Sequence, residues 1–288
     1  MTYFPESELV LNEKGQVYHL GIFPENISDK IILVGDQDRV GMIGQFLEEI
    51  EHSSIHREFH IITGKYKDKR ISIISTGIGT DNIDIVINEL DALKNIDLVS
   101  RTEKKSKTSL EIVRIGTCGI LQAEIPLHSF ILSTFAYGLD NVAHFYPISY
   151  SSEEVVLCKK ITSHLELPIE IQPYISKSSD ELFNKLVSEK TIKGITVTSS
   201  GFYGPQGRSL RLGLRTTEMN EKLSSFQYEG HKISNFEMES SALFALGKEL
   251  GHNCATICLG VANRPKNEFT KGFEKEMKNL IEYVLNRI

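Results

Sequence analysis

The sequence predicts a single-domain α/β protein with three layers, α/β/α, built around a central mixed β-sheet. Short apolar, β-branched runs alternate along the chain with longer segments of helical periodicity. Strands that alternate with helices favour a mainly parallel or mixed sheet that is covered on both faces. The chain has no internal repeat and no linker rich in proline, glycine or serine, so we expect one domain over residues 1–288.

The predicted strands are apolar runs rich in isoleucine and valine, each bounded by polar or glycine residues. The segment RISIIST, for example, is followed by Gly77 and Gly79. The predicted strands are Lys30–Gly35, Arg57–Tyr66, Arg70–Thr76, Glu111–Gly116, Ser129–Phe135, Ile195–Ser200 and Asn253–Val261.

The predicted helices carry apolar residues at spacings of three and four. After the turn Asp36–Asp38, a helical stretch runs to about Glu49, and a second helix begins near Ile83, whose face continues at Val86, Ile87, Leu90 and Leu93. Two later helices have the clearest patterns. Glu239–Leu250 ends before Gly251, a residue suited to the position after a helix. The final segment, Phe273–Ile288, is an amphipathic packing helix.

Composition and charge exclude several classes of protein. The net charge of −6 argues against a general nucleic-acid binder, which usually has a basic face, and Ser100–Ser109 is expected to be a solvated loop. No apolar run approaches the roughly 18 residues that span a bilayer, and the N-terminal residues do not resemble a targeting signal. The four cysteines lack CxxC spacing. We therefore expect a cytoplasmic protein with reduced thiols and no membrane or nucleic-acid partner.

Two segments combine arginine with glycine at predicted strand ends. Gly35 and Arg39 lie where a strand passes into a helix, and backbone amides at such a junction favour an anion. Arg114, Gly116 and Thr117 can gather further donors around one oxyanion, because a guanidinium matches phosphate geometry. A polar turn with a surface arginine is the alternative for the first segment, and a buried structural ion pair is the alternative for the second.

A third segment pairs an amide with a guanidinium in a turn. Gln206 both donates and accepts, so it can recognise the O=C–N–H edge of a base. Arg208 can stabilise charge on a carbonyl oxygen, and Phe202 can stack on a ring. Ordinary loop chemistry is the alternative.

Two carboxylates, Glu237 and Glu239, flank Met238 at an apolar strand-to-helix junction. Acids at such a position are costly unless they accept hydrogen bonds, and the vicinal hydroxyls of a sugar are suitable donors. Glycoside hydrolysis by paired acids is the alternative, although residues two apart on one strand are too close for the inverting geometry.

Other motifs are too weak to indicate a metal or a cofactor. His56 and His60 flank a glutamate in the wrong place for HExxH, and they lie in a predicted strand. Ser75–Gly79 holds only part of a dinucleotide fingerprint, and no Walker A loop is present. We expect no metal and no cofactor.

Taken together and in this order, the motifs resemble the uridine phosphorylase branch of the trimeric or hexameric nucleoside phosphorylase superfamily. The resemblance extends from Tyr18–Gly21 to Asn263–Arg264. It implies a nucleoside phosphorylase-like fold and the cleavage of uridine by phosphate into uracil and ribose 1-phosphate. It also implies homodimers, or hexamers built from dimers, with shared active sites. A purine or broad-range phosphorylase and a non-catalytic nucleoside-binding homologue are the alternatives.

The resemblance assigns a role to each group of site residues. Gly35, Arg39, Arg114 and Thr117 would bind phosphate, together with Arg57 from a neighbouring subunit. Phe202, Gln206 and Arg208 would hold the base. Glu237, Met238 and Glu239 would hold the ribose, with His19 reaching across the subunit interface. The residues implied in catalysis are Arg208, Gln206, Arg114 and Glu239.

Three features, of which the last two are departures from the family pattern, concern substrate and ions. Purine-cleaving relatives usually have an aspartate where this chain has Asn263, which favours a pyrimidine substrate. Thr80–Asn82 replaces a Gly-Pro-Ser segment whose serine helps to bind a monovalent cation, whereas Glu58 is retained, so the resemblance leaves a structural potassium ion open. Val261–Ala262 is smaller than the usual pair at the base pocket.

Overall fold

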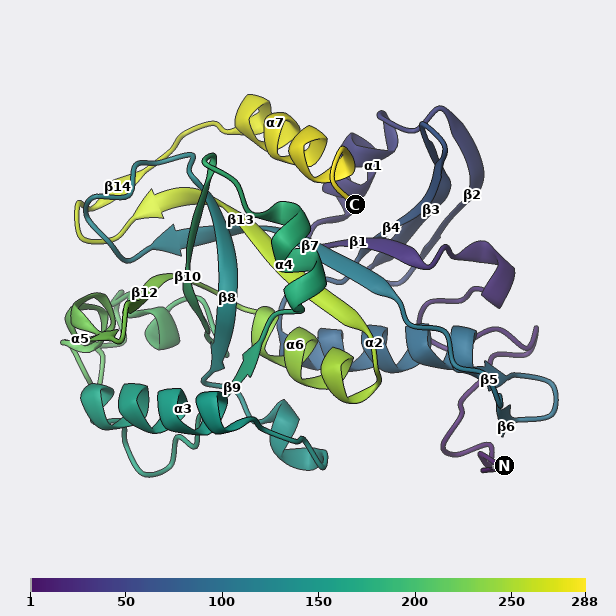
Figure 1. Cartoon of the computed structure of the whole chain (residues 1–288), viewed down its shortest axis with the longest axis horizontal. Helices are drawn as coiled ribbons and strands as arrows, with labels where there is room; N and C mark the ends of the chain where they lie inside the picture. The colour runs from purple at the N-terminus through teal and green to yellow at the C-terminus, as the bar shows by residue number, and fades with distance from the viewer. Residues whose placement is uncertain (1) are drawn as a thin grey trace.

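The computed structural model describes residues 2–288. It has the predicted three layers, with a twelve-stranded mixed sheet between two layers of helices (Figure 1). The strands of this sheet are β1 (Lys30–Val34), β2 (Glu49–His56), β3 (Phe59–Tyr66), β4 (Lys69–Ser75), β7 (Glu111–Ile120), β8 (Phe130–Gly138), β9 (Tyr174–Lys177), β10 (Thr191–Thr198), β11 (Gln227–Tyr228), β12 (His231–Glu237), β13 (Asn253–Asn263) and β14 (Glu268–Phe269). A small separate hairpin joins β5 (Ile96–Asp97) to β6 (Thr102–Glu103).

The sheet combines parallel crossovers with antiparallel hairpins. Its main path is β11-β12-β10-β8-β13-β7-β1-β4-β3-β2. Strands β4, β1, β7 and β13 are mutually parallel, as are β8, β10 and β12. The two groups meet where β13 pairs antiparallel with β8.

Half of the sheet closes on itself. Besides its parallel pairing with β10, β12 pairs antiparallel with β7 through Asn235↔Ile120 and Phe236↔Gly119. Strands β7, β13, β8, β10 and β12 therefore form a closed ring, and register shifts in three of its pairings accompany the curvature. At the closure, a Cβ on Gly119 would lie 2.4 Å from the Phe236 ring, so only glycine leaves room there.

Three clusters of buried side chains hold the layers together. One cluster packs α2 (Thr80–Asn95) and α6 (Ser240–Glu249) against one sheet face, and another packs α1 (Gln37–Gly44), α4 (Asp180–Leu186) and α7 (Glu274–Leu285) against the opposite face (Figure 1). The third joins α3 (Ser152–Leu165) and α5 (Met219–Ser225) to the strands of the ring. Within residues 2–288, no helix combines the length and the apolar character needed to cross a membrane.

The structure corrects four of the predicted boundaries. The helix after Asp36 ends at Gly44, because β2 already begins at Glu49. Strand β7 continues to Ile120, so Arg114 lies inside a strand rather than at its end. Arg57, predicted to start a strand, lies in the turn between β2 and β3 with φ 55°. The segment Ser100–Ser109, predicted as a loop throughout, contains the short strand β6.

Candidate active site

The site is built where the ring of strands meets α6. Glu237 is the last residue of β12, Glu239 immediately precedes α6, and Arg114 projects from β7. The Arg114 side chain lies over Gly116, where a Cβ would stand 2.1 Å from its Nη1. This explains why an arginine and a glycine two residues apart are needed on the strand.

Arg114 is paired with both carboxylates. Its Nη2 contacts Glu239 Oε2, and its Nη1 lies 3.4 Å from Glu237 Oε2. The three side chains are at most 5% exposed, so water screens these charges little. Burial disfavours the charge of Arg114, but Glu239 and Glu237 outweigh it, and the pKa of Arg114 lies above its usual value. The buried ion pair considered from the sequence is thus present, and it is made with the predicted ribose carboxylates.

Glu239 is the titratable centre of this cluster. Burial raises the pKa of Glu239 to about 7; Arg114 opposes the rise, and the like charge of Glu237 adds to it. The Glu239 Oε1 atom accepts a hydrogen bond from the Gly79 amide at 3.0 Å, which connects the site to the start of α2. The Glu239 Oε2 atom therefore contacts the Arg114 guanidinium, and Oε1 contacts a backbone amide.

Arg39 brings a second guanidinium to the cluster. Burial lowers the pKa of Arg39, and repulsion from Arg114 lowers it further. The Arg39 Nη1 atom donates only a long hydrogen bond, 3.4 Å, to the Ile115 carbonyl. Among residues 2–288, no carboxylate lies within ion-pair distance of Arg39, and Arg114 Nε has no hydrogen-bond partner. Two neighbouring guanidiniums with unused donors are chemically suited to binding an anion.

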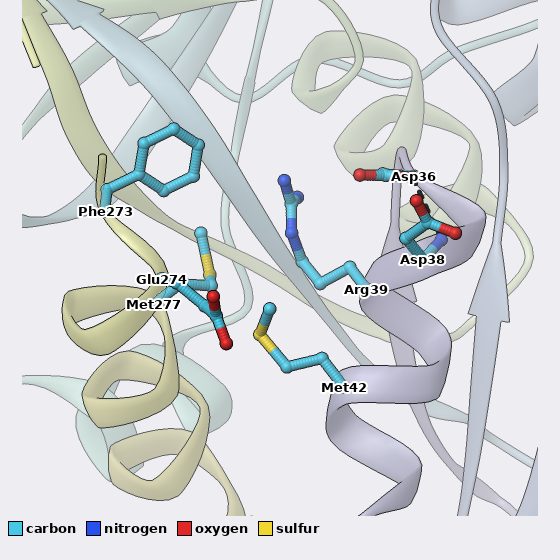
Figure 2. Close-up of a pocket in the computed structure, with 7 residues that line it drawn as sticks. All are labelled: Asp36, Asp38, Arg39, Met42, Phe273, Glu274 and Met277. Atoms are coloured by element: carbon cyan, nitrogen blue, oxygen red, sulfur yellow. Dashed lines mark hydrogen bonds between the residues drawn. The ribbon is translucent and has the colours of Figure 1, made fainter. Parts of the chain in front are cut away.

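Arg39 also borders a cavity between α1 and α7. Figure 2 shows its side chain extending from α1 between Asp36 and Phe273. The cavity has a volume of about 270 Å³, and α7 contributes Glu274 and Met277 to its wall. At the start of α1, Asp36 caps the helix by accepting a hydrogen bond from the Asp38 amide at 3.0 Å. The guanidinium is thus open to solvent-sized molecules on one side.

The other two residues predicted to bind phosphate within this chain follow β1 and lie in β7. Gly35 directly follows β1 and lies close to a neighbouring loop, where an added Cβ would stand 3.3 Å from the Gly77 carbonyl oxygen. Thr117 is half-buried in β7, three residues beyond Arg114. A side chain at position 35 would therefore crowd the loop that contains Gly77 and Gly79, and the Gly79 amide of this loop is hydrogen-bonded to Glu239.

The predicted base-binding residues form a compact unit. Gln206 is buried in the short 3₁₀ helix Gly204–Gln206, and its Oε1 accepts a hydrogen bond from Arg208 Nη1 at 2.5 Å. The Arg208 guanidinium stacks 3.7 Å from the centre of the Phe202 ring and 5.7 Å from that of Phe236. Burial, and then the nearby charge of Arg264, lowers the pKa of Arg208 to about 10. All three predicted base residues are therefore in contact.

Strand β12 connects the base unit to the anion site. Phe236 contacts the Arg208 guanidinium, and the next residue, Glu237, faces Arg114. Met238 follows half-buried, with its amide donating to Glu239 Oε2 at 3.2 Å. Consecutive positions at the end of β12 thus contact both the base unit and Arg114.

His19 and Arg57 lie outside this cluster. The Nδ1 atom of His19 contacts Glu89 Oε1 at 2.7 Å, and its carbonyl lies 2.7 Å from His56 Nδ1. Arg57 is exposed and lies 5.1 Å over the Tyr18 ring. Both side chains are on the surface of this chain, so their action from a neighbouring subunit stays a prediction.

Asn263 is held by the backbone around it. Its amide nitrogen donates to the carbonyls of Gln122 and Ile125, at 3.2 and 2.9 Å, and its Oδ1 accepts from the Lys266 amide at 3.1 Å.

Thr198, which the sequence motifs do not include, ends β10 opposite Glu237 and donates to Glu237 Oε1 at 2.7 Å. A polar residue ending an apolar strand was the available signal for it.

The sequence matches the Phosphorylase superfamily over residues 29–288, and the chain belongs to this superfamily. It is 28% identical over 273 residues to a uridine phosphorylase of Thermococcus kodakarensis, covering 95% of this chain and 87% of that protein. It is 27% identical over 240 residues to a DeoD-type purine nucleoside phosphorylase of Oceanobacillus iheyensis, covering 83% and 84%.

Among solved structures, a Trypanosoma brucei nucleoside phosphorylase with uridine phosphorylase activity superposes with a TM-score of 0.89 at 27% identity. The superposition covers 97% of this chain and 99% of the trypanosomal one. A Phytophthora capsici uridine phosphorylase, 22% identical with a TM-score of 0.69 over 99% and 98% of the two chains, has the same fold. The predicted nucleoside phosphorylase fold is confirmed.

Proposed function

We propose that the protein is an enzyme that cleaves uridine with inorganic phosphate into uracil and ribose 1-phosphate. The observation that carries this proposal is the pair of guanidiniums of Arg39 and Arg114, whose donors are not fully used, beside paired buried carboxylates. The similarity to uridine phosphorylases over most of the chain supports the same reaction.

Phosphate is already an anionic nucleophile at neutral pH, so the site needs mainly to position it. Arg39 and Arg114, with Gly35 and Thr117, would hold phosphate beneath C1′ of the ribose, and Glu239 with Met238 would hold the sugar. Holding two reactants together supplies roughly 7–11 kcal/mol of the barrier in well-oriented model reactions. Such an arrangement requires no activated serine or cysteine and no cofactor.

The Gln206–Arg208 pair would hold the uracil. As the C1′–N1 bond stretches, negative charge develops on the base, and Arg208, which is hydrogen-bonded to Gln206, would stabilise it on a pyrimidine oxygen. One preorganised donor of this kind is typically worth about 3–4 kcal/mol in the transition state. Burial lowers the pKa of Arg208, but the side chain stays charged at neutral pH because its pKa of about 10 still lies above neutrality.

The assembly, compartment and ion content form part of the same proposal. Residues 1–288 would act as one domain in a cytoplasmic homodimer, or a hexamer of dimers, in which Arg57 and His19 reach a neighbour's site. A structural potassium ion near Glu58 would be an addition to the assembly and not a participant in the reaction.

The test is a panel of uridine, thymidine, inosine and adenosine at equal concentration, each with and without phosphate. Phosphate-dependent release of uracil, fastest from uridine, is the expected result. A preference for inosine would make the enzyme a purine phosphorylase, and release that continues undiminished without phosphate would make it a nucleosidase. Calorimetric binding with no turnover of any nucleoside would indicate a non-catalytic binding protein.

A further inference from the structure

The Glu237 carboxylate is fully engaged by the protein itself. Its Oε2 accepts hydrogen bonds from the Glu239 and Ser240 amides, both at 3.0 Å, and faces Arg114. Its Oε1 accepts from the Ser240 amide at 3.1 Å and from Thr198 Oγ1 at 2.7 Å. With both oxygens engaged in this way, Glu237 acts as a structural acceptor at the centre of the site and is not available to ribose hydroxyls.

These contacts also cap the N-terminus of helix α6. The residue before the helix, Glu239, makes no side-chain capping hydrogen bond. Its place is taken by Glu237, which accepts from the first amides, and by Thr198 Oγ1, which accepts from the Ser241 amide at 2.9 Å. A carboxylate at a helix N-terminus is also favoured by the helix dipole. One hydroxyl and one carboxylate therefore hold both the helix start and the Arg114 guanidinium.

We propose that Thr198 is a positioning residue for phosphate binding, acting through Glu237 on Arg114. By holding Oε1, the Thr198 hydroxyl fixes the rotation of the carboxylate so that Oε2 faces the arginine. Without it, Oε1 keeps only the Ser240 amide as a donor, so the carboxylate is held less firmly and the guanidinium has a less fixed partner on that side. The inference rests on the proposed function and replaces the ribose-binding role expected for Glu237.

The chain supplies a matched control on the same strand. Thr196 is also fully buried in β10, and its Oγ1 donates at 3.0 Å to Asn235 Oδ1, its register partner on β12. Residue type, burial and donation to a register partner on β12 are therefore the same as at Thr198. The two sites differ in the acceptor, which at Thr196 is a neutral amide that makes no ion pair with Arg114. They also differ in the second contact of the hydroxyl, which is the Ser133 hydroxyl at 2.6 Å for Thr196 and the Ser241 amide for Thr198.

The experiment measures phosphate affinity by calorimetry without nucleoside, and KM for phosphate and kcat with uridine. Thr198→Val should weaken phosphate binding about tenfold, the size of a lost hydrogen bond to a charged group, whereas Thr198→Ser should stay within about twofold of wild type. Thr196→Val should lower thermal stability but leave phosphate affinity within about twofold. Equal losses of affinity in Thr196→Val and Thr198→Val, or no rescue by serine, would overturn the inference.

A double-mutant cycle tests the route through Glu237. In a Glu237→Gln background, Thr198→Val should change phosphate affinity by less than about twofold, because the charged acceptor is already gone. Fully additive losses would show that Thr198 acts by another path. Wild type that binds phosphate without cleaving uridine would contradict the proposed function alone, since the calorimetric comparison still decides the positioning role.

Discussion

Arg114 and Glu239 form an ion pair in the buried centre of the site, although 125 positions separate them in the sequence. Each charge stays in the protein interior because the other is present, since an unpaired ion there would cost several kcal/mol. Glu239 nevertheless has a second like charge, Glu237, beside it. The protonation state of Glu239 is therefore expected to make the site depend on pH near neutrality.

Glu239 should make folding stability depend on pH. Its pKa is about 7 in the folded protein against an ordinary value of 4.5, so between these values the folded chain binds a proton that the unfolded chain has lost. Stability from this group is full below pH 4.5 and declines as pH rises toward 7. Relative to Glu239→Gln, which cannot titrate, the wild type should lose up to about 3 kcal/mol over this window. Urea denaturation in phosphate-free buffer measures it, and a difference that stays constant with pH would contradict it.

Arg208 should act mainly in the transition state. Replacing it with alanine removes a donor aimed at the departing base and should lower kcat by about 10²–10³, with KM for phosphate nearly unchanged. Steady-state kinetics with each substrate varied in turn provides the measurement. The matched control is Arg211→Ala, an exposed arginine on the same segment, which should retain wild-type kinetics. A rise in phosphate KM that accounts for the whole loss would place Arg208 with the anion instead.

Asn263→Asp should not convert the enzyme to purine cleavage. The two carbonyls that accept from the Asn263 amide would face a carboxylate, which has no hydrogen to donate. The loss of two buried hydrogen bonds should destabilise the chain by at least about 1–3 kcal/mol. Thermal unfolding and an inosine assay check both parts. A stable variant that cleaves inosine faster than uridine would refute this view of Asn263.

Shared sites should allow two impaired variants to complement each other. Arg39→Ala and Arg57→Ala should each be impaired alone, since phosphate loses one cation in either case. If Arg57 acts on the neighbour's site, a mixed dimer has one site lacking both arginines and one intact. Random reassembly after joint denaturation should then restore about a quarter of wild-type activity. Activity no greater than the average of the two separate variants would mean that both arginines serve the site of their own chain.

Local sequence patterns predicted the elements that position the site, but not the contacts that lie between distant segments. Two carboxylates at an apolar junction correctly marked the end of β12 and the start of α6. The helix α3 was missed although Ser151 and Glu154 form a capping box at its start, a signal readable in the sequence.

The contacts of Asn263 could not be predicted in the same way. Its two carbonyl partners lie in a loop about 140 positions earlier, and no local pattern relates them. The pairing of β12 with β7 was also not foreseen, because register shifts bend the strands without altering which residues are apolar. Thr198 depends on that curved ring, since its partner Glu237 is placed by β12.

Because the α6 cap is supplied by β10 and β12, the helix start and the anion site depend on the same folded strands. Within one subunit, neither forms on a chain whose ring has not yet closed. Opening of the ring should therefore remove the cap of α6 and the carboxylate partners of Arg114 together, so this part of the site should be lost with the core of the subunit.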